Sequence, residues 1–135
     1  MDLETSMRIA AAGMQAQSAR LRVTAENLAN AQSTAESPGG DPYQRKTISF
    51  ANALDRATGA RLVEVRRYGT DPAAFERRFE PSHPAADASG YVLYPNVNPL
   101  IELMDMREAQ RSFEANLTAL QQARGMLQRT LDLLR

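Results

Sequence analysis

The feature that most constrains this chain is a hydrophobic repeat with a period of seven in its last part, residues 98–135. The main row contains Met106, Phe113, Leu120, Leu127 and Leu134. A second row, three residues earlier each time, contains Leu103, Gln110, Leu117, Arg124 and Leu131. Alternating offsets of three and four are typical of a coiled-coil seam. The repeat predicts one helix over residues 99–134, with Asn98 as its N-cap and Pro99 at its first position.

The N-terminal part of the chain, residues 3–31, carries a second series with the same period. Its large members are Met7, Met14, Leu21 and Leu28. Small residues stand beside them, namely Ala10, Ala11, Ser18, Ala25 and Ala31. A strip of small side chains next to large ones lets a partner helix approach closely. This segment is therefore predicted to be a second helix, capped by Asp2 and ended by the turn-forming residues 31–40.

The middle of the chain differs in composition, because the prolines and most of the aromatic residues gather there. Residues 43–50 and 61–68 are predicted to be short strands, and residues 91–94 a further one. The rest of residues 69–95 is interrupted by prolines and is predicted to be loop.

These elements predict a mainly α protein with a small β-rich middle. The long N- and C-terminal helices are expected to pair as an antiparallel coiled coil. The paired helices would occupy residues 1–31 and 96–135, and the middle, 32–95, would form a small lobe at their open end. Aligning the two large rows predicts a register in which paired numbers sum to a constant: Met7 with Leu134, Met14 with Leu127, Leu21 with Leu120, and Leu28 with Phe113. Residues 99–109 would then overhang onto the lobe.

Composition argues against several classes of function. The chain has 16 basic and 16 acidic residues, so a nucleic-acid partner is not favoured. It has no cysteine and one histidine, His83, which reads as a turn residue rather than a metal ligand. No phosphate loop or nucleophile motif is present, so neither an enzyme nor a cofactor is expected. No apolar run is long enough to span a membrane, and the N-terminus does not read as a cleavable signal.

Two basic pairs, Arg66–Arg67 and Arg77–Arg78, are open to two interpretations. They could face an acidic partner or an anionic polymer, or be ordinary solvated charge, and the second reading is favoured. The helices raise a different question. Two helices alone bury too little apolar surface to offset the backbone entropy that they lose on folding, so other subunits are expected to complete them.

Motifs at both ends and across the middle carry a family resemblance. Near the N-terminus stand the runs SARLR (18–22) and AENLAN (25–30), and before the last helix stand GYV (90–92) and PNVN (95–98). The last helix adds MDM (104–106), EAN (114–116) and TLD (130–132). Together these runs resemble the bacterial flagellar basal-body rod proteins, most closely those of the proximal rod. One departure is Phe113, where the family more often has tyrosine.

The resemblance implies a structural subunit of the rod, polymerised through its terminal helices, that transmits torque across the periplasm. It also implies export by the flagellar type III apparatus without signal cleavage. The implied partners are other rod proteins, the base that anchors the rod, and further copies of the chain. The expected assembly interface contains Met7, Met14, Leu21, Asn27, Leu28, Asn30, Met106, Phe113, Leu117, Leu120, Leu127, Leu131 and Leu134.

A competing interpretation comes from a different class of protein. A cytosolic helical adaptor or chaperone could bind partner helices through the same apolar stripes. Copurification with flagellar basal bodies would separate the two, because a rod subunit should be found there and an adaptor should not.

Overall fold

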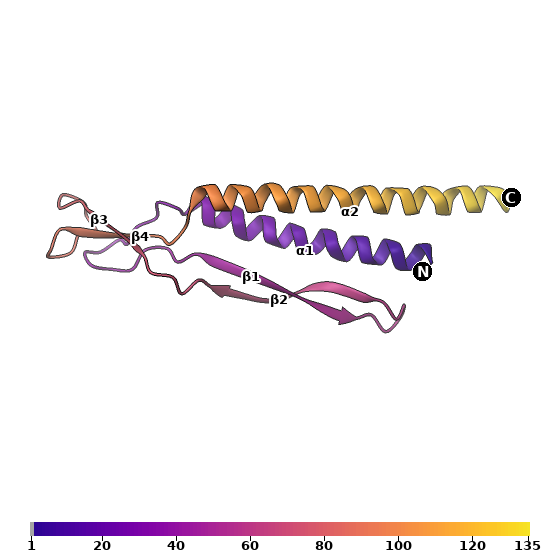
Figure 1. Ribbon diagram of the computed structural model, residues 1–135, viewed down its shortest axis with the longest axis horizontal. Helices are drawn as coiled ribbons and strands as arrows, with labels where there is room; N and C mark the ends of the chain where they lie inside the picture. The colour runs from indigo at the N-terminus through magenta and orange to yellow at the C-terminus, as the bar shows by residue number, and fades with distance from the viewer. Residues whose placement is uncertain (1) are drawn as a thin grey trace. The chain divides into compact units, whose positions relative to one another are not determined.

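The computed structural model describes residues 2–135, and its largest elements are two long helices at the ends of the chain (Figure 1). Helix α1 spans Leu3–Ala29 and helix α2 spans Pro99–Leu133. The predicted helices, 3–31 and 99–134, are therefore confirmed to within two residues. The predicted fold class, mainly α with paired terminal helices and a small β-rich middle, is also confirmed.

Both helices begin at the caps that the sequence predicts. The Oδ1 atom of Asp2 accepts a hydrogen bond from the backbone N–H of Thr5 at 2.7 Å. The Oδ1 atom of Asn98 accepts one from the N–H of Leu100 at 3.1 Å. Each cap satisfies a backbone donor that has no partner within the first helical turn. Pro99 then occupies the first helical position, where its missing N–H costs nothing.

Within residues 2–135, four strands form two separate two-stranded sheets. Strand β1 (Lys46–Leu54) pairs with β2 (Arg61–Thr70), and the turn between them is closed by a hydrogen bond from the N–H of Asp55 to the carbonyl of Ala60 at 2.8 Å. The prediction of strand 43–50 placed its start and end too early. Residues 43–45 instead make hydrogen bonds to other segments, such as those from the Tyr43 hydroxyl to Asn27 and from the Arg45 N–H to Asn96, and the strand continues to Leu54.

The second sheet contains a strand that the sequence did not predict. Strand β3 (Glu76–Phe79) pairs antiparallel with β4 (Tyr91–Tyr94), with Glu76 opposite Tyr94 and Phe79 opposite Tyr91. Arginine side chains cover the tyrosine rings: the guanidinium of Arg77 lies 4.4 Å from the Tyr91 ring centre, and that of Arg78 lies 4.1 Å from that of Tyr94. These cation–π contacts help hold a strand whose own sequence is mostly charged.

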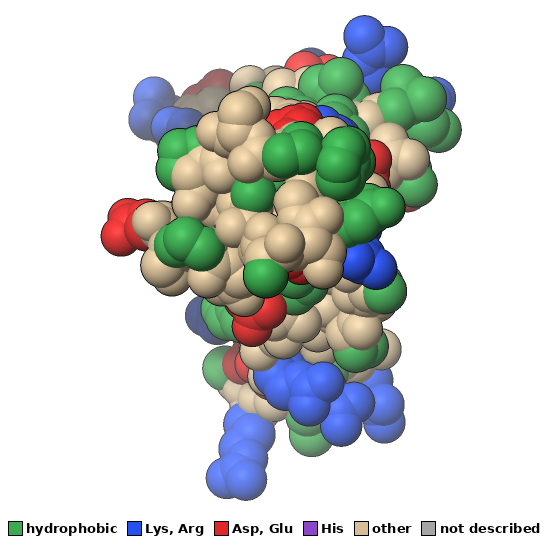
Figure 2. Space-filling model, turned by 90° about the vertical axis from the view of Figure 1, so that its left-hand side faces the viewer, with side chains coloured by type: hydrophobic (Ala, Val, Ile, Leu, Met, Phe, Trp, Pro, Cys, Tyr) green, Lys and Arg blue, Asp and Glu red, His purple; other side chains and the backbone are tan. Residues whose placement is uncertain are grey.

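The β3–β4 hairpin has a small core of its own, formed by Ala85, Val92 and Tyr94. His83 stands in the adjoining turn, where its Nδ1 atom accepts a hydrogen bond from the N–H of Ala85 at 3.0 Å, so its interpretation as a turn residue is confirmed. Figure 2 shows hydrophobic side chains scattered among polar and charged ones on the face of the molecule that it presents, with Lys and Arg side chains gathered at its lower end.

The chain divides into two compact units, and each helix contributes to both. Unit 1 contains residues 1–21, 48–67 and 107–135, and unit 2 contains residues 22–47 and 68–106. Most of the β1–β2 hairpin thus belongs with the ends of the helices in unit 1. There Arg8 of α1 forms an ion pair with Asp55 at 3.4 Å. The division predicted from the sequence, paired helices (1–31 and 96–135) and a middle lobe (32–95), follows different boundaries and stays a prediction.

Judged on residues 2–135, neither helix combines the length and the apolar character that a membrane crossing requires.

Candidate assembly interface

The two helices pack antiparallel, but in a register different from the predicted one. An alanine Cβ at Gly13 would lie 2.8–2.9 Å from the side-chain amide of Asn116. Arg20 forms an ion pair with Glu108 at 3.3 Å. In unit 2, the side chain of Asn27 lies 3.4 Å from that of Glu102. Paired numbers therefore sum to about 129, rather than to 141 as the predicted register of heptad layers required.

The register prediction was wrong because it aligned the large side chains of the two rows with each other. Small residues, rather than these large ones, occupy the contact between the helices. Leu21 lies level with the region of Glu108 rather than with Leu120. The overhang also changes ends. Residues 99–109 do not overhang, and instead roughly the last two turns of α2 run on past the start of α1 in unit 1 (Figure 1).

The contact between the helices in unit 1 consists mainly of small residues, and we call it the small-residue seam. Helix α1 contributes Ala10, Gly13 and Ala16, and α2 contributes Ala109, Asn116 and Ala123. The second row predicted for α2 is displaced from this face by one residue, and Gln110, Arg124 and Leu131 of that row are exposed. The first row does border the seam, since Met106, Phe113 and Leu120 are half-buried. Alanine is easily overlooked in a search for large apolar side chains, which explains the error.

The residues predicted for the assembly interface have three kinds of environment. Asn27 is buried. Nine are half-buried, namely Met7, Met14, Leu21, Leu28, Asn30, Met106, Phe113, Leu117 and Leu120. The remaining three, Leu127, Leu131 and Leu134, are exposed. Their role in contacts between subunits stays a prediction.

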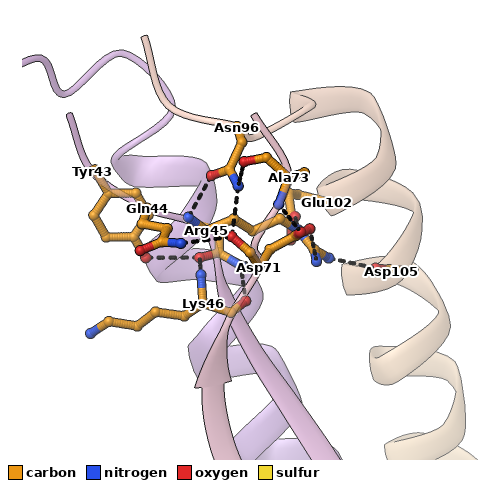
Figure 3. A network of polar contacts seen from close by, with 10 residues as sticks. Tyr43, Gln44, Arg45, Lys46, Asp71, Ala73, Asn96, Glu102 and Asp105 are labelled. Atoms are coloured by element: carbon orange, nitrogen blue, oxygen red, sulfur yellow. Dashed lines mark hydrogen bonds and ion pairs between the residues drawn. The ribbon is translucent and has the colours of Figure 1, made fainter. Parts of the chain in front are cut away.

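A second site, in unit 2, is a network of polar side chains around the fully buried Glu102 of α2 (Figure 3). We call it the polar network; it joins Asn27, Tyr43, Arg45, Asp71, Asn96, Glu102 and Asp105. The Nε atom of Arg45 donates to a carboxylate oxygen of Glu102. This pairing matters because an unpaired carboxylate is very costly to bury.

Asn27 uses all of its hydrogen-bonding capacity within the polar network. Its Oδ1 atom accepts hydrogen bonds from the hydroxyl of Tyr43 and from the backbone N–H of Lys46, each at 2.8 Å. Its Nδ2 atom donates to the Lys46 carbonyl at 2.8 Å and to Glu102 at 3.4 Å. Through Asn27, the AENLAN run (25–30) thus connects α1 to the start of β1 and to the start of α2. Because only 1% of its surface is exposed, Asn27 makes its contacts within the subunit.

Arg45 lies among three carboxylates in Figure 3, those of Glu102, Asp71 and Asp105. Burial opposes its charge, but the hydrogen bond and charge of Glu102, together with the charges of Asp71 and Asp105, raise the pKa of Arg45 above its ordinary value. Burial, followed by the charges of Glu26 and Glu102, likewise raises the pKa of Tyr43. The guanidinium and the phenol therefore keep their protons at neutral pH. The polar network holds α1, the start of β1 and the start of α2 together. It contains no acid–base pair suited to catalysis.

Sequence reasoning missed this network apart from Asn27. Its members come from several segments, most of which lie far apart in the chain, and no periodic pattern connects them. One signal was present: Glu102 stands within a run of apolar residues, LIELM (100–104), where an acidic residue is unexpected. Within residues 2–135, no cluster of three or more histidine and acidic side chains is arranged to hold a metal ion.

The exposed surface of α2 is rich in large apolar side chains at both ends of the helix. In unit 2, the first turns expose Leu100, Ile101, Leu103 and Met104. In unit 1, the last turns expose Met126, Leu127, Leu131 and Leu133, and the exposed Leu134 follows directly after the helix. Contiguous apolar surface of this kind commonly marks a site of protein–protein contact.

Comparison with known proteins gives a consistent result along the chain. Residues 88–133 match the family described as "Flagellar basal body rod FlgEFG protein C-terminal". The chain is 47% identical over 133 residues to a flagellar basal-body rod protein FlgC of Agrobacterium fabrum, covering 98% of this chain and 96% of that one. It is 40% identical to FlgC of Salmonella typhimurium, covering 93% and 92%, and 34% identical to FlgC of Bacillus subtilis, covering 95% of each.

Proposed function

The chain belongs to the family of flagellar basal-body rod proteins FlgC and is a structural subunit of the proximal rod, and from this premise we propose that it polymerises through its terminal helices to transmit torque. The observation that carries the proposal is the near-complete coverage of these relatives. The similarity includes both helices and the middle of the chain, so the whole architecture belongs to the rod family.

The surface of α2 supports polymerisation through the helices. Leucine, isoleucine and methionine side chains are exposed at both ends of α2, although the protein buries smaller alanines between its helices. Burying such a side chain contributes about 1.5–3 kcal/mol, and the isolated chain does not gain this stabilisation. Contacts with neighbouring subunits would provide it.

We further propose that its partners are other rod proteins, the base that anchors the rod, and further copies of this chain. The subunit would reach the rod through flagellar export without cleavage of its N-terminus. Asp2 caps α1 by accepting a hydrogen bond from the Thr5 N–H, so a chain that retains Asp2 retains this cap.

Fractionation of flagellated cells tests the proposal. A tagged full-length chain expressed in a strain that lacks its own copy should restore motility and copurify with basal bodies. Its N-terminal peptide, identified by mass spectrometry, should retain Asp2. A chain that stays in the cytoplasm and leaves motility unrestored would instead favour the adaptor interpretation and overturn the proposal.

A further inference from the structure

Unit 1 has two apolar surfaces that the described residues leave uncovered. One is a row of three leucines, Leu127, Leu131 and Leu134, near the end of α2. We call it the terminal leucine stripe. The other is a groove of about 400 Å³ between α1 and the β1–β2 hairpin. We call it the α1–hairpin groove.

The terminal leucine stripe continues the face of α2 that α1 covers elsewhere in unit 1. Leu127 and Leu134 follow Leu120 at intervals of seven residues, and Leu131 lies between them on the same side of the helix. Leu120 is half-buried against α1, whereas Leu131 is 48% and Leu134 79% exposed. The difference arises because α1 begins too late in the antiparallel register to reach these turns. The stripe is a helix-binding face without a helix on it.

The α1–hairpin groove lies on the opposite side of α1 from the small-residue seam. Its helical wall includes Ala11, Ala12 and Gln15, which point away from α2 at about 100° of rotation per residue. Its strand wall includes Leu54, Leu62 and Val63. The two alanines leave room for large side chains, and the volume is within the range of about 300–1,000 Å³ typical of binding clefts.

The terminal leucine stripe and the α1–hairpin groove are surrounded by charges of opposite sign. Around the stripe, residues 124–135 carry three arginines and one aspartate, and Arg124 lies beside the leucines on one side of α2. The groove is bordered by two carboxylates, Asp55 and Glu64, and by one arginine, Arg8, which is already paired with Glu4 and Asp55. A basic helix end thus matches a groove with an excess of negative charge.

The two surfaces cannot meet within one chain. The stripe extends beyond the first turn of α1, and α2 is a single unbroken helix that cannot bend back to the groove beside Arg8 and Ala12. We propose that the terminal leucine stripe of one copy docks into the α1–hairpin groove of a second copy. Such a contact joins two different surfaces, so repeating it produces an open helical filament or a ring rather than a closed two-fold dimer. The inference rests on the proposed rod function and identifies one of its self-contacts.

Cysteine crosslinking can test the contact directly, because the chain contains no cysteine of its own. Two single-cysteine variants, Leu131→Cys and Ala12→Cys, are coexpressed with different tags and treated with a short thiol crosslinker, in assembled basal bodies and in concentrated solution. A crosslinked dimer carrying both tags is expected. The matched control is Leu133→Cys with Ala12→Cys, because Leu133 is 86% exposed in the same turn but faces away from the stripe.

A second pair of variants tests the same contact without a crosslinker at position 131. The substitution Leu131→Asp should lower the yield of an Ala12→Cys to Leu127→Cys crosslink about tenfold or more, and Leu133→Asp should leave it within about twofold. Both positions lie beyond α1, so circular dichroism should show an unchanged helical fold.

Three results would overturn the proposal: equal crosslinking from positions 131 and 133, crosslinking of position 131 to a different rod protein alone, or equal effects of the two aspartate substitutions. Copurification with basal bodies is scored separately in the same samples. A chain that enters the rod without this crosslink disproves the contact and leaves the rod function standing. A chain absent from basal bodies disproves both.

Discussion

The small-residue seam of unit 1 and the polar network of unit 2 join segments of the same two helices by opposite means. The seam contains alanines and Gly13, and allows α1 and α2 to approach closely. The polar network instead places charged and amide groups around the buried Glu102. Close packing of small residues tolerates some sliding along the helix axis, since one alanine resembles the next. Hydrogen bonds do not tolerate such sliding, because their strength depends on a fixed distance and angle.

The register of the helix pair is specified in unit 2, by the polar network. Asn27 satisfies its four hydrogen bonds at one axial position, and a shift of α2 by one turn would remove Glu102 from both Asn27 and Arg45. A shift would leave a carboxylate buried without a partner, which costs several kcal/mol. A buried polar residue that fixes helix register is well attested in coiled coils. Here the polar network has that role, and the seam sets the distance between the helices.

The largest effect is expected from breaking the polar network on one side. Arg45→Met removes the guanidinium and leaves Glu102 buried beside other carboxylates, so the free energy of unfolding should fall by about 3–5 kcal/mol. Urea unfolding of the full chain, followed by circular dichroism, measures this. The double variant Arg45→Met with Glu102→Met removes both charges and should recover most of the loss. No recovery would contradict the ion-pair explanation.

Substitution of the two helical glycines should separate distance from register. An added Cβ at Gly13 would meet the amide of Asn116, which is held by a hydrogen bond to the carbonyl of Ser112 at 2.9 Å. At Gly125 no atom lies within 4 Å of an added Cβ. Both Gly→Ala changes favour a helix by up to about 1 kcal/mol. Of the two added methyl groups, only that of Gly13→Ala would contact the facing helix at the small-residue seam.

Overpacking typically costs about 1–3 kcal/mol, so Gly13→Ala should be less stable than Gly125→Ala by that amount. The measurement is again the free energy of unfolding in urea. Equal stabilities would show that the helices can separate slightly at the seam without cost, and would weaken the distinction between the two regions.

Some of this architecture could be predicted from the sequence, because it depends on local pattern. The helix bounds and both caps depend on residues near one another, such as Asn98 and Pro99. The register could not be predicted, because large leucines dominate the heptad pattern, whereas the hydrogen bonds around the buried Glu102 fix the register. The polar network could not be predicted, because Arg45 and Glu102 are separated by 57 residues along the chain. Strand β3 was missed because its residues depend on pairing and on arginine–tyrosine stacking.

The smallest effect concerns the tip of the β1–β2 hairpin, where polar groups are partly exposed rather than fully buried. The carboxylate of Asp55 accepts hydrogen bonds from the Thr58 hydroxyl at 2.8 Å and the Ala57 N–H at 3.1 Å, and it pairs with Arg8. These hydrogen bonds, with the charge of Arg8, lower the pKa of Asp55 below its ordinary value of 3.8. A lowered pKa means that the carboxylate favours the folded turn above pH 3.8, and that this contribution is lost as the pH falls through the lower folded value.

The chemical shift of the Ala57 amide, followed by NMR during acid titration, should therefore change with a midpoint below pH 3.8. Asp55→Asn should remove the transition, because an amide does not titrate, and should leave global stability nearly unchanged because exposed ion pairs contribute little. Asp132→Asn, at an exposed position of α2, is the matched control and should preserve the transition. A midpoint at or above 3.8 would show that the turn does not favour the charged carboxylate. The contrast with the polar network would then rest on burial alone, because hydrogen bonds at an exposed site would have no measurable effect on ionisation.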